Sequence, residues 1–187
     1  MKNWTSRAAH QVPSAVYFDL DNTFYEYENT HKLALDATLE RVETTLGIDR
    51  EAFVSALNLS KRVIKGRLGN TAASHSRILY FKKALEHLGF GSQPLLTLQL
   101  EQVYWNTFLR EMKLFDGVID LLEELRIAGI PMALVTDLTA QIQLRKIVYL
   151  GIERYFDVIV TSEEAGEEKP SVEPFALAKE IIGEMQD

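Results

Sequence analysis

Cysteine is absent from this 187-residue chain, and so is any long run of apolar residues. The lack of cysteine excludes disulfides, thiolate nucleophiles and zinc sites with cysteine ligands, whichever compartment the protein occupies. The N-terminal stretch 1–15 has no continuous apolar segment of the kind found in signal peptides. No other run approaches the roughly 20 apolar residues that a membrane-spanning helix needs. We therefore expect a cytoplasmic protein with no membrane partner.

The chain also lacks an excess of basic residues. Its 20 Lys and Arg against 27 Asp and Glu give a formal net charge of −7. This balance argues against nucleic acid as a partner but allows a local cationic pocket for a small phosphorylated metabolite. Hydrophobic residues make up 47% of the chain, which is typical of a globular protein. The sequence does not indicate an oligomeric state, and catalysis is left to carboxylates, hydroxyls, lysine and histidine.

The order of predicted helices and strands indicates the fold. A short apolar strand over 15–18 is followed by a long helical region and then by alternating elements: helix 118–128, strand 131–135, helix 141–150, strand 157–160 and helix 172–185. Such alternation is typical of a parallel sheet with crossover helices. We predict an α/β protein whose Rossmann-like core comprises residues 1–23 and 114–187. An all-helical domain over 24–113 is expected to interrupt this core.

The strongest chemical signal is the string Asp19-Leu20-Asp21-Asn22-Thr23 at the end of the first strand. Ligands of open α/β sheets bind beyond the carboxyl ends of the strands. One carboxylate there can attack phosphorus while the other protonates the leaving oxygen and later activates water. A divalent cation is needed to hold the like charges together, which makes Mg²⁺ the expected cofactor.

Two other interpretations of this string compete. An EF-hand loop is excluded, because the sixth position is Phe24 instead of Gly and the twelfth is Thr30 instead of Glu. An Asx-type turn that caps a helix stays open for the string taken alone.

Two later strand ends favour the catalytic interpretation over the turn. Thr136 follows the second predicted strand and offers a hydroxyl to a phosphoryl oxygen, and Lys169 follows the third and offers an ammonium group. Each is weak evidence alone, since Thr136 could be a helix N-cap and most lysines are solvated. Nucleophile, hydroxyl and ammonium at three successive strand ends are together much harder to obtain by chance.

These strings identify a family resemblance. Residues 18–23 resemble the first motif of the haloacid dehalogenase superfamily, residues 134–137 the second and residues 166–170 the third. The similarity spans essentially the whole chain, and it implies that the helical region is the cap domain that this family inserts after its first motif.

The resemblance implies specific roles. Asp19 would be the nucleophile and a Mg²⁺ ligand, and Asp21 the general acid/base with its backbone carbonyl on the metal. Thr136 and Lys169 would stabilise the transferred phosphoryl group. Two further candidates for phosphate binding are Thr23 and Asp137, although relatives often carry Asn at the latter position and its role is left open. Since the dehalogenases usually lack an acid at the place of Asp21, the resemblance favours a phosphatase.

One departure concerns the family's fourth motif, an acidic loop that completes the metal site. The chain stops at Asp187 before that motif is reached, so we expect a shortened form of a longer protein that binds Mg²⁺ weakly. Glu163, Glu164, Glu167 and Glu168 could supply a substitute ligand, but a solvated acidic loop is the expected interpretation. The alternatives to a phosphatase are a catalytically silent regulatory or binding domain, a phosphomutase and a dehalogenase.

The predicted cap domain is locally basic, and substrate choice is expected to reside there. Arg67 and Arg77 could reach a substrate anion when the cap closes. A solvated helix face is the competing interpretation for either residue. His31, His75 and His87 lack metal-ligand spacing and are expected at the surface or at helix ends.

Overall fold

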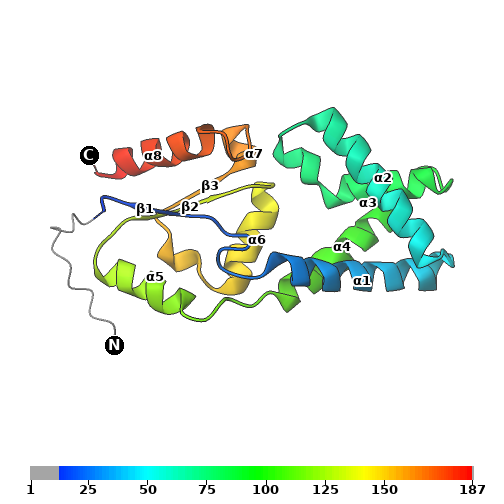
Figure 1. Ribbon diagram of the computed structural model, residues 1–187, viewed down its shortest axis with the longest axis horizontal. Helices are drawn as coiled ribbons and strands as arrows, with labels where there is room; N and C mark the ends of the chain where they lie inside the picture. The colour runs from blue at the N-terminus through cyan, green and yellow to red at the C-terminus, as the bar shows by residue number, and fades with distance from the viewer. Residues whose placement is uncertain (1–12, 187) are drawn as a thin grey trace.

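The computed structural model describes residues 13–186, which form two lobes joined side by side (Figure 1). One lobe contains three strands with helices on both sides, and the other is made of helices alone. None of the described helices is long and apolar enough to cross a membrane.

The three strands form one parallel sheet in the order β1-β2-β3. Their bounds are β1 Val16–Phe18, β2 Met132–Thr136 and β3 Val158–Thr161. All five residues of β2 are buried, as expected for the central strand of a parallel sheet. Strand β1 lies at the edge of the sheet formed by the described residues, with Tyr17 37% exposed. The predicted parallel α/β fold is confirmed, with strand bounds that differ by one residue.

The two faces of the sheet are covered by different helices (Figure 1). Side chains alternate along β2, so that Ala133 and Val135 pack against α8 (Glu173–Gln186) while Met132 and Leu134 join the core on the opposite side. Helices α5 and α6 cover that opposite side. The elements of this part are α5 Val118–Ile127, α6 Ala140–Leu150, the 3₁₀ helix η2 Glu153–Tyr155 and the short helix α7 Ser162–Ala165.

The helical lobe contains four α-helices and one 3₁₀ helix between β1 and α5: α1 Tyr27–Leu46, α2 Arg50–Leu68, η1 Ala72–His75, α3 Arg77–His87 and α4 Pro94–Glu111. Asp49 caps α2 by accepting a hydrogen bond from Ala52 N, at 3.2 Å. Ser76 caps α3 in the same way, by accepting a hydrogen bond from the Leu79 backbone N–H.

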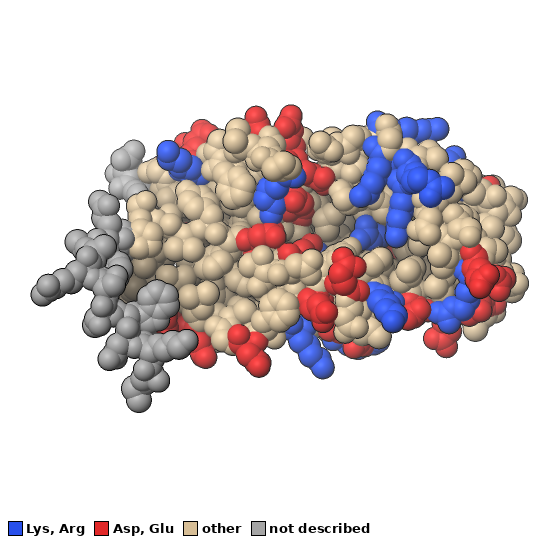
Figure 2. Space-filling model, viewed as in Figure 1, with Lys and Arg blue, Asp and Glu red and all other residues tan. Residues whose placement is uncertain are grey.

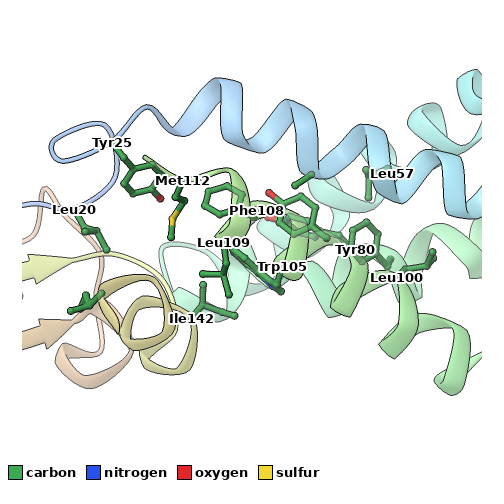
Figure 3. Close-up of a cluster of buried hydrophobic side chains, with 14 of the residues drawn as sticks. Leu20, Tyr25, Leu57, Tyr80, Leu100, Trp105, Phe108, Leu109, Met112 and Ile142 are labelled. Carbon is green, nitrogen blue, oxygen red and sulfur yellow. The ribbon is translucent and has the colours of Figure 1, made fainter. Parts of the chain in front are cut away.

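Helix α4 carries one hydrophobic core through both lobes (Figure 3). At its C-terminal end, Leu109 and Met112 belong to the same buried cluster as Leu20, which follows strand β1. Trp105 and Phe108 lie at the junction of the lobes. Toward its N-terminal end the same core continues through buried side chains that include Leu100, Tyr80 and Leu57. Because the buried cluster is continuous, apolar burial holds the two lobes together as well as each lobe internally.

A matched pair of leucines on α4 tests this description. Leu100 is fully buried, whereas Leu98 is 54% exposed. Leu100→Ala should lower the free energy of unfolding by about 2–5 kcal/mol, since it removes buried methyl groups and leaves a cavity. Leu98→Ala should change that free energy by no more than about 0.5 kcal/mol. Urea denaturation followed by circular dichroism measures both, and equal effects would contradict the described packing.

Candidate active site

The carboxyl end of the sheet brings Asp19 and Lys169 into contact. Lys169 Nζ lies 2.5 Å from Asp19 Oδ1 and donates a second hydrogen bond to the Val135 carbonyl oxygen at 3.0 Å. Asp19 follows β1, Val135 lies in β2 and Lys169 belongs to the loop after β3, so three strand ends meet at this point. The Asp19 side chain is 41% exposed and the Lys169 side chain only 19%. An incoming substrate can therefore reach the carboxylate.

Asp137 holds the loop that carries Lys169. Its Oδ1 accepts a hydrogen bond from the Lys169 backbone N–H at 3.0 Å, and its Oδ2 lies 3.8 Å from Lys169 Nζ. The carboxylate thus fixes both the backbone and the charge of the lysine. The negative charge of Asp137 is therefore directed toward the ammonium group of Lys169.

Thr136 ends β2 with its side chain 1% exposed. Its hydroxyl oxygen accepts a hydrogen bond from Gln143 Nε2 at 2.5 Å, and the same nitrogen donates to the Asp137 carbonyl oxygen at 2.6 Å. Gln143 on α6 therefore fixes the position of the hydroxyl. The hydroxyl proton is still free to be donated, because this hydrogen bond uses only a lone pair of the oxygen.

Asp21 is held by a buried lysine. Lys146 Nζ from α6 lies 2.8 Å from Asp21 Oδ1 and 2.9 Å from Oδ2, and the Tyr25 hydroxyl also donates to Oδ1. The Lys146 side chain is fully buried, while the Asp21 side chain is 24% exposed. Lys146 and Tyr25 therefore hold the Asp21 carboxylate, and part of this side chain is still exposed to solvent.

Lys146 lies in an aromatic enclosure at the junction of the lobes. Its ammonium nitrogen is 5.3–5.9 Å from the centroids of four rings, those of Tyr25, Tyr27, Trp105 and Phe108. Burial lowers the pKa of Lys146 from its usual value, and the Asp21 carboxylate opposes that change. The ring faces and the carboxylate together replace the hydration that the ammonium group loses.

The turns beside these residues adopt unusual backbone angles. Asn22 has φ 64° and Leu138 has φ 83°, both in the left-handed region. Asparagine tolerates this region, and here its Oδ1 also accepts a hydrogen bond from Tyr27 N at 2.9 Å at the start of α1. A leucine pays a larger steric cost, and such strain is concentrated at functional sites. Because the hydrogen bond from Tyr27 N to Asn22 joins residues five apart, it is not the Asx-type turn that competed with the catalytic interpretation, in which the side chain bonds the backbone two residues on.

Two sequence-predicted site residues are not brought into this constellation. Thr23 is exposed, and only its backbone N–H makes a described contact, to the Leu20 carbonyl oxygen. Arg67 is exposed in the last turn of α2 and makes no ion pair within the described residues. Their proposed contacts with phosphate stay predictions.

Arg77 is buried instead of lying on a solvated helix face. It is 8% exposed, and its guanidinium lies 5.3–5.7 Å from the ring centroids of Tyr80, Tyr104 and Trp105. Its Nη1 donates to the His75 carbonyl oxygen at 2.7 Å and its Nη2 to the Tyr27 hydroxyl at 2.5 Å. Its Nε is buried and has no hydrogen-bond partner.

The acidic loop before Lys169 is not fully solvated, contrary to the prediction. The Glu168 side chain is only 12% exposed, and its Oε2 lies 3.1 Å from His75 Nε2 in the helical lobe. Burial raises the pKa of Glu168, with the Asp137 charge acting in the same direction. Glu163, which is exposed, accepts a hydrogen bond from Ala140 N at the start of α6. The loop therefore connects the two lobes.

Lys146 and Gln143 were not predicted as site residues, although their positions on the helix indicate them. The buried residues of α6 are Ile142, Gln143, Lys146 and Ile147. Two polar residues thus share the apolar face of a helix that directly follows Thr136 and Asp137. A buried lysine or glutamine requires a polar partner, so its position on that face points to a contact with the site.

The residues that could hold a magnesium ion are few. Mg²⁺ is commonly bound through one or two carboxylates, with water and substrate phosphate as the remaining ligands. Asp19 suits this pattern, since it is partly exposed and its Oδ2 makes no hydrogen bond within the described part of the chain. Both Asp21 carboxylate oxygens are engaged by Lys146, which leaves its backbone carbonyl. Within residues 13–186 no three His, Asp or Glu side chains gather as metal ligands.

A cavity of about 180 Å³ separates the helical lobe from the loop after β2. From the helical lobe it is lined by residues that include His75, Arg77 and Trp105, and from the other lobe by residues that include Leu138 and Thr139. Asp19 and Lys169 are not among its lining residues. It adjoins the buried Arg77, and two carboxylates, Glu101 and Glu163, also line it.

Known proteins resemble this chain over most of its length. It is 43% identical over 168 residues to the ribulose-1,5-bisphosphate 5-phosphatase of Halopiger xanaduensis, which covers 89% of this chain and 70% of that protein. It is 30% identical over 169 residues to the glyceraldehyde 3-phosphate phosphatase of Methanopyrus kandleri, with 90% and 70% of the two chains covered.

Solved structures share the fold. A HAD phosphatase from Thermococcus onnurineus superposes with a TM-score of 0.61 at 26% identity, over 90% of this chain and 71% of that one. The HAD-hydrolase YfnB from Bacillus subtilis, solved with magnesium bound, gives a TM-score of 0.59 at 22% identity, over 88% and 71% of the two chains. The family model described as haloacid dehalogenase-like hydrolase matches residues 16–183. Parallel sheet, strand-end carboxylates and sequence similarity agree, and the chain belongs to the haloacid dehalogenase-like hydrolase family.

Proposed function

We propose that this protein hydrolyses the phosphate ester of a small sugar phosphate, with Asp19 as nucleophile and Mg²⁺ as cofactor. The observation that carries the proposal is the contact between Asp19 and Lys169 at the meeting point of three strand ends. A partly exposed carboxylate beside a fixed ammonium group suits attack on a phosphoryl group, because the cation can neutralise the charge on the phosphoryl oxygens. When bound, the metal ion would supply further charge neutralisation at those oxygens.

The reaction would proceed in two displacements. In the first, an Asp19 oxygen forms a bond to phosphorus while the ester oxygen leaves and takes a proton from Asp21. In the second, water attacks the phosphorus of the aspartyl phosphate, gives its proton to Asp21 and releases inorganic phosphate with Asp19 restored. Lys169 and the Thr136 hydroxyl would donate hydrogen bonds to the phosphoryl oxygens in both steps.

Lys146 and Tyr25 would position Asp21 for its role. An acid/base group must be held within hydrogen-bond reach of the proton it transfers. The Lys146 ammonium binds both Asp21 oxygens and Tyr25 binds one of them. Since Lys146 is itself enclosed by aromatic rings, the carboxylate has little freedom to rotate. We expect Lys146 to act as a positioning residue.

The substrate that the similarity favours is a pentose bisphosphate. The relative at 43% identity is a ribulose-1,5-bisphosphate 5-phosphatase, and the relative at 30% identity is a phosphatase of the smaller glyceraldehyde 3-phosphate. We propose removal of the 5-phosphate of ribulose 1,5-bisphosphate as the reaction. In this proposal residues 24–113 form a cap domain that covers the substrate, which the contact between Glu168 and His75 supports because it joins the two lobes beside Lys169.

A second candidate function is a catalytically silent domain that binds a phosphorylated ligand. The observation in its favour is that no three carboxylate or histidine side chains gather as metal ligands within residues 13–186. Titration of the protein with Mg²⁺ in a calorimeter, with and without inorganic phosphate, separates the two candidates. Binding that requires phosphate supports the phosphatase, because the anion then supplies ligands to the metal.

The nucleophile is tested by the Asp19→Asn variant. An amide cannot form the aspartyl phosphate, so phosphate release from ribulose 1,5-bisphosphate should fall by at least about 1,000-fold. The exposed Asp120 on α5 gives the matched control, and Asp120→Asn should leave the rate unchanged. A colorimetric phosphate assay measures both. Full activity of Asp19→Asn would refute the assignment.

Metal dependence is tested by chelation. Treatment of the wild-type protein with EDTA should abolish phosphate release, and an excess of Mg²⁺ should restore it, because the phosphoryl charge is no longer neutralised without the ion. The same assay measures the effect. Activity that persists after dialysis against chelator would exclude Mg²⁺ as a required cofactor.

The positioning role is tested by Lys146→Met. Methionine fills a similar volume among the aromatic rings but frees Asp21 to rotate, so kcat should fall about 10- to 100-fold. The urea midpoint should change little, since the partly exposed Asp21 stays hydrated after the lysine is removed. The exposed neighbour Arg145 provides the control variant Arg145→Met. A loss of stability as large as the loss of activity would indicate a purely structural lysine.

A further inference from the structure

The loop that carries Lys169 is in contact with both lobes. From the sheet lobe, Asp137 accepts a hydrogen bond from the Lys169 backbone N–H at 3.0 Å. From the helical lobe, His75 Nε2 lies 3.1 Å from Oε2 of Glu168, the residue before the lysine. Among the residues that the structure describes, no other hydrogen bond or ion pair joins helices α1 to α4 to the chain from α5 onward. His75 therefore gives the helical lobe a direct polar connection to the loop of Lys169.

The Glu168 side of this contact is linked to Lys169 through one peptide group. The Glu168 carbonyl oxygen accepts a hydrogen bond from the Ser171 backbone N–H at 3.0 Å, while the N–H of the same peptide group binds Asp137. Because a peptide group is planar and stiff, a movement of the Glu168 backbone also moves the Lys169 backbone. The position of the Glu168 side chain and that of the lysine are therefore coupled.

The Glu168 carboxyl group depends on His75 for its position. Its side chain is only 12% exposed, and its second oxygen, Oε1, is buried without a hydrogen-bond partner within the described part of the chain. A buried carboxyl group that loses its partner pays a desolvation cost, which it can avoid by turning toward solvent. Removal of the imidazole is therefore expected to displace Glu168.

The His75 side of the contact is itself held by the helical lobe. His75 ends η1, and η1 contacts α7 across the junction of the lobes. The His75 carbonyl oxygen accepts a hydrogen bond from Arg77 Nη1 at 2.7 Å, and Arg77 is buried with its guanidinium 5.3 Å from the centroid of the Tyr104 ring. The imidazole is thus attached to a well-packed part of that lobe and can orient the group that it contacts.

The charges of the two lobes favour the same contact. Figure 2 shows acidic side chains gathered beside α7 at the junction and basic side chains over α2. Lys65 on α2 acts on both partners, since its charge lowers the pKa of His75 further than burial does and opposes the rise in the pKa of Glu168 that burial and Asp137 cause. Attraction between these surfaces would hold His75 against Glu168.

A neutral imidazole makes this contact. Burial lowers the pKa of His75 to about 4, and the charges of Lys65 and Arg77 act in the same direction. The ring is therefore uncharged at pH 7, so the contact is a hydrogen bond that does not need a positive charge on His75. A side-chain amide of the right length can consequently replace the ring.

We infer that His75 is a positioning residue for Lys169: by holding the Glu168 carboxyl group, it fixes the peptide from which the ammonium group reaches Asp19. This inference rests on the proposed function, because it takes Lys169 to act on the transferred phosphoryl group. Asp137 fixes that peptide from the sheet lobe, and His75 fixes it from the helical lobe. Loss of either contact lets the ammonium group move away from the phosphoryl oxygens that it must stabilise in the transition state.

Three substitutions of His75 test the inference through phosphate release from ribulose 1,5-bisphosphate. His75→Ala should lower kcat about tenfold and change KM by less than about twofold, because the lysine stabilises chiefly the transition state. His75→Gln should retain most of kcat, since the glutamine amide nitrogen can occupy the place of Nε2. His75→Asn should behave like His75→Ala, since its shorter amide does not reach Glu168. The exposed His87 at the end of α3 gives the control His87→Ala, which should leave kcat unchanged.

A double-mutant cycle identifies Glu168 as the partner. Glu168→Ala should lower kcat as much as His75→Ala, and the double variant should lose no more than either single variant, since both changes remove the same contact. Additive losses, or full kcat in His75→Ala, would overturn the inference while leaving the phosphatase intact. A wild-type protein that releases no phosphate would overturn the proposed function, and the inference with it.

Hydrogen exchange measures the positioning without turnover. The backbone N–H groups of Lys169 and Ser171 are both hydrogen bonded, so exchange in the segment 166–171 reports how often this loop opens. His75→Ala should speed exchange in this segment alone, whereas His75→Gln and His87→Ala should leave it at the wild-type rate. Unchanged exchange in His75→Ala would overturn the inference. Faster exchange throughout the chain would indicate a purely structural histidine and would overturn it as well.

Discussion

The contact between the buried Lys146 and Asp21 is the interaction on which the geometry of the candidate active site depends. A lysine that is fully removed from water must be compensated, and the carboxylate and the four surrounding rings provide that compensation. The rings come from the loop after β1, from α1 and from α4, while the lysine comes from α6. The contact therefore lies where the first strand end, a sheet-covering helix and the helical lobe meet.

The reactive groups follow from the way parallel strands end at one edge of the sheet. Asp19, Thr136 and Lys169 come from three separate strand ends, and a neighbouring side chain supports each of the last two. Gln143 fixes the Thr136 hydroxyl, and Asp137 fixes the loop of Lys169. Such contacts restrict the movement of Thr136 and Lys169. They would therefore lower the entropic cost of aligning these side chains with a phosphoryl group.

Charge in this molecule is distributed unevenly. The net charge is negative, and the carboxylates Asp19, Asp21 and Asp137 are all paired with lysines at the sheet edge. Across the junction, Arg77 of the helical lobe is buried, and its Nη atoms contact neutral groups, the His75 carbonyl oxygen and the Tyr27 hydroxyl.

The sequence alone determined the parallel α/β fold, the helical region between the first two strands and the three strand ends with their polar residues. These are recoverable because strand length, helix periodicity and motif order are local properties of the chain. Tertiary structure alone decided that Lys146 binds Asp21, that Arg77 and Glu168 are buried and that Thr23 and Arg67 stay exposed. Lys146, Arg77 and Glu168 contact side chains more than 30 residues away, so the local pattern of a helix can indicate that such a residue is buried but not which group it contacts.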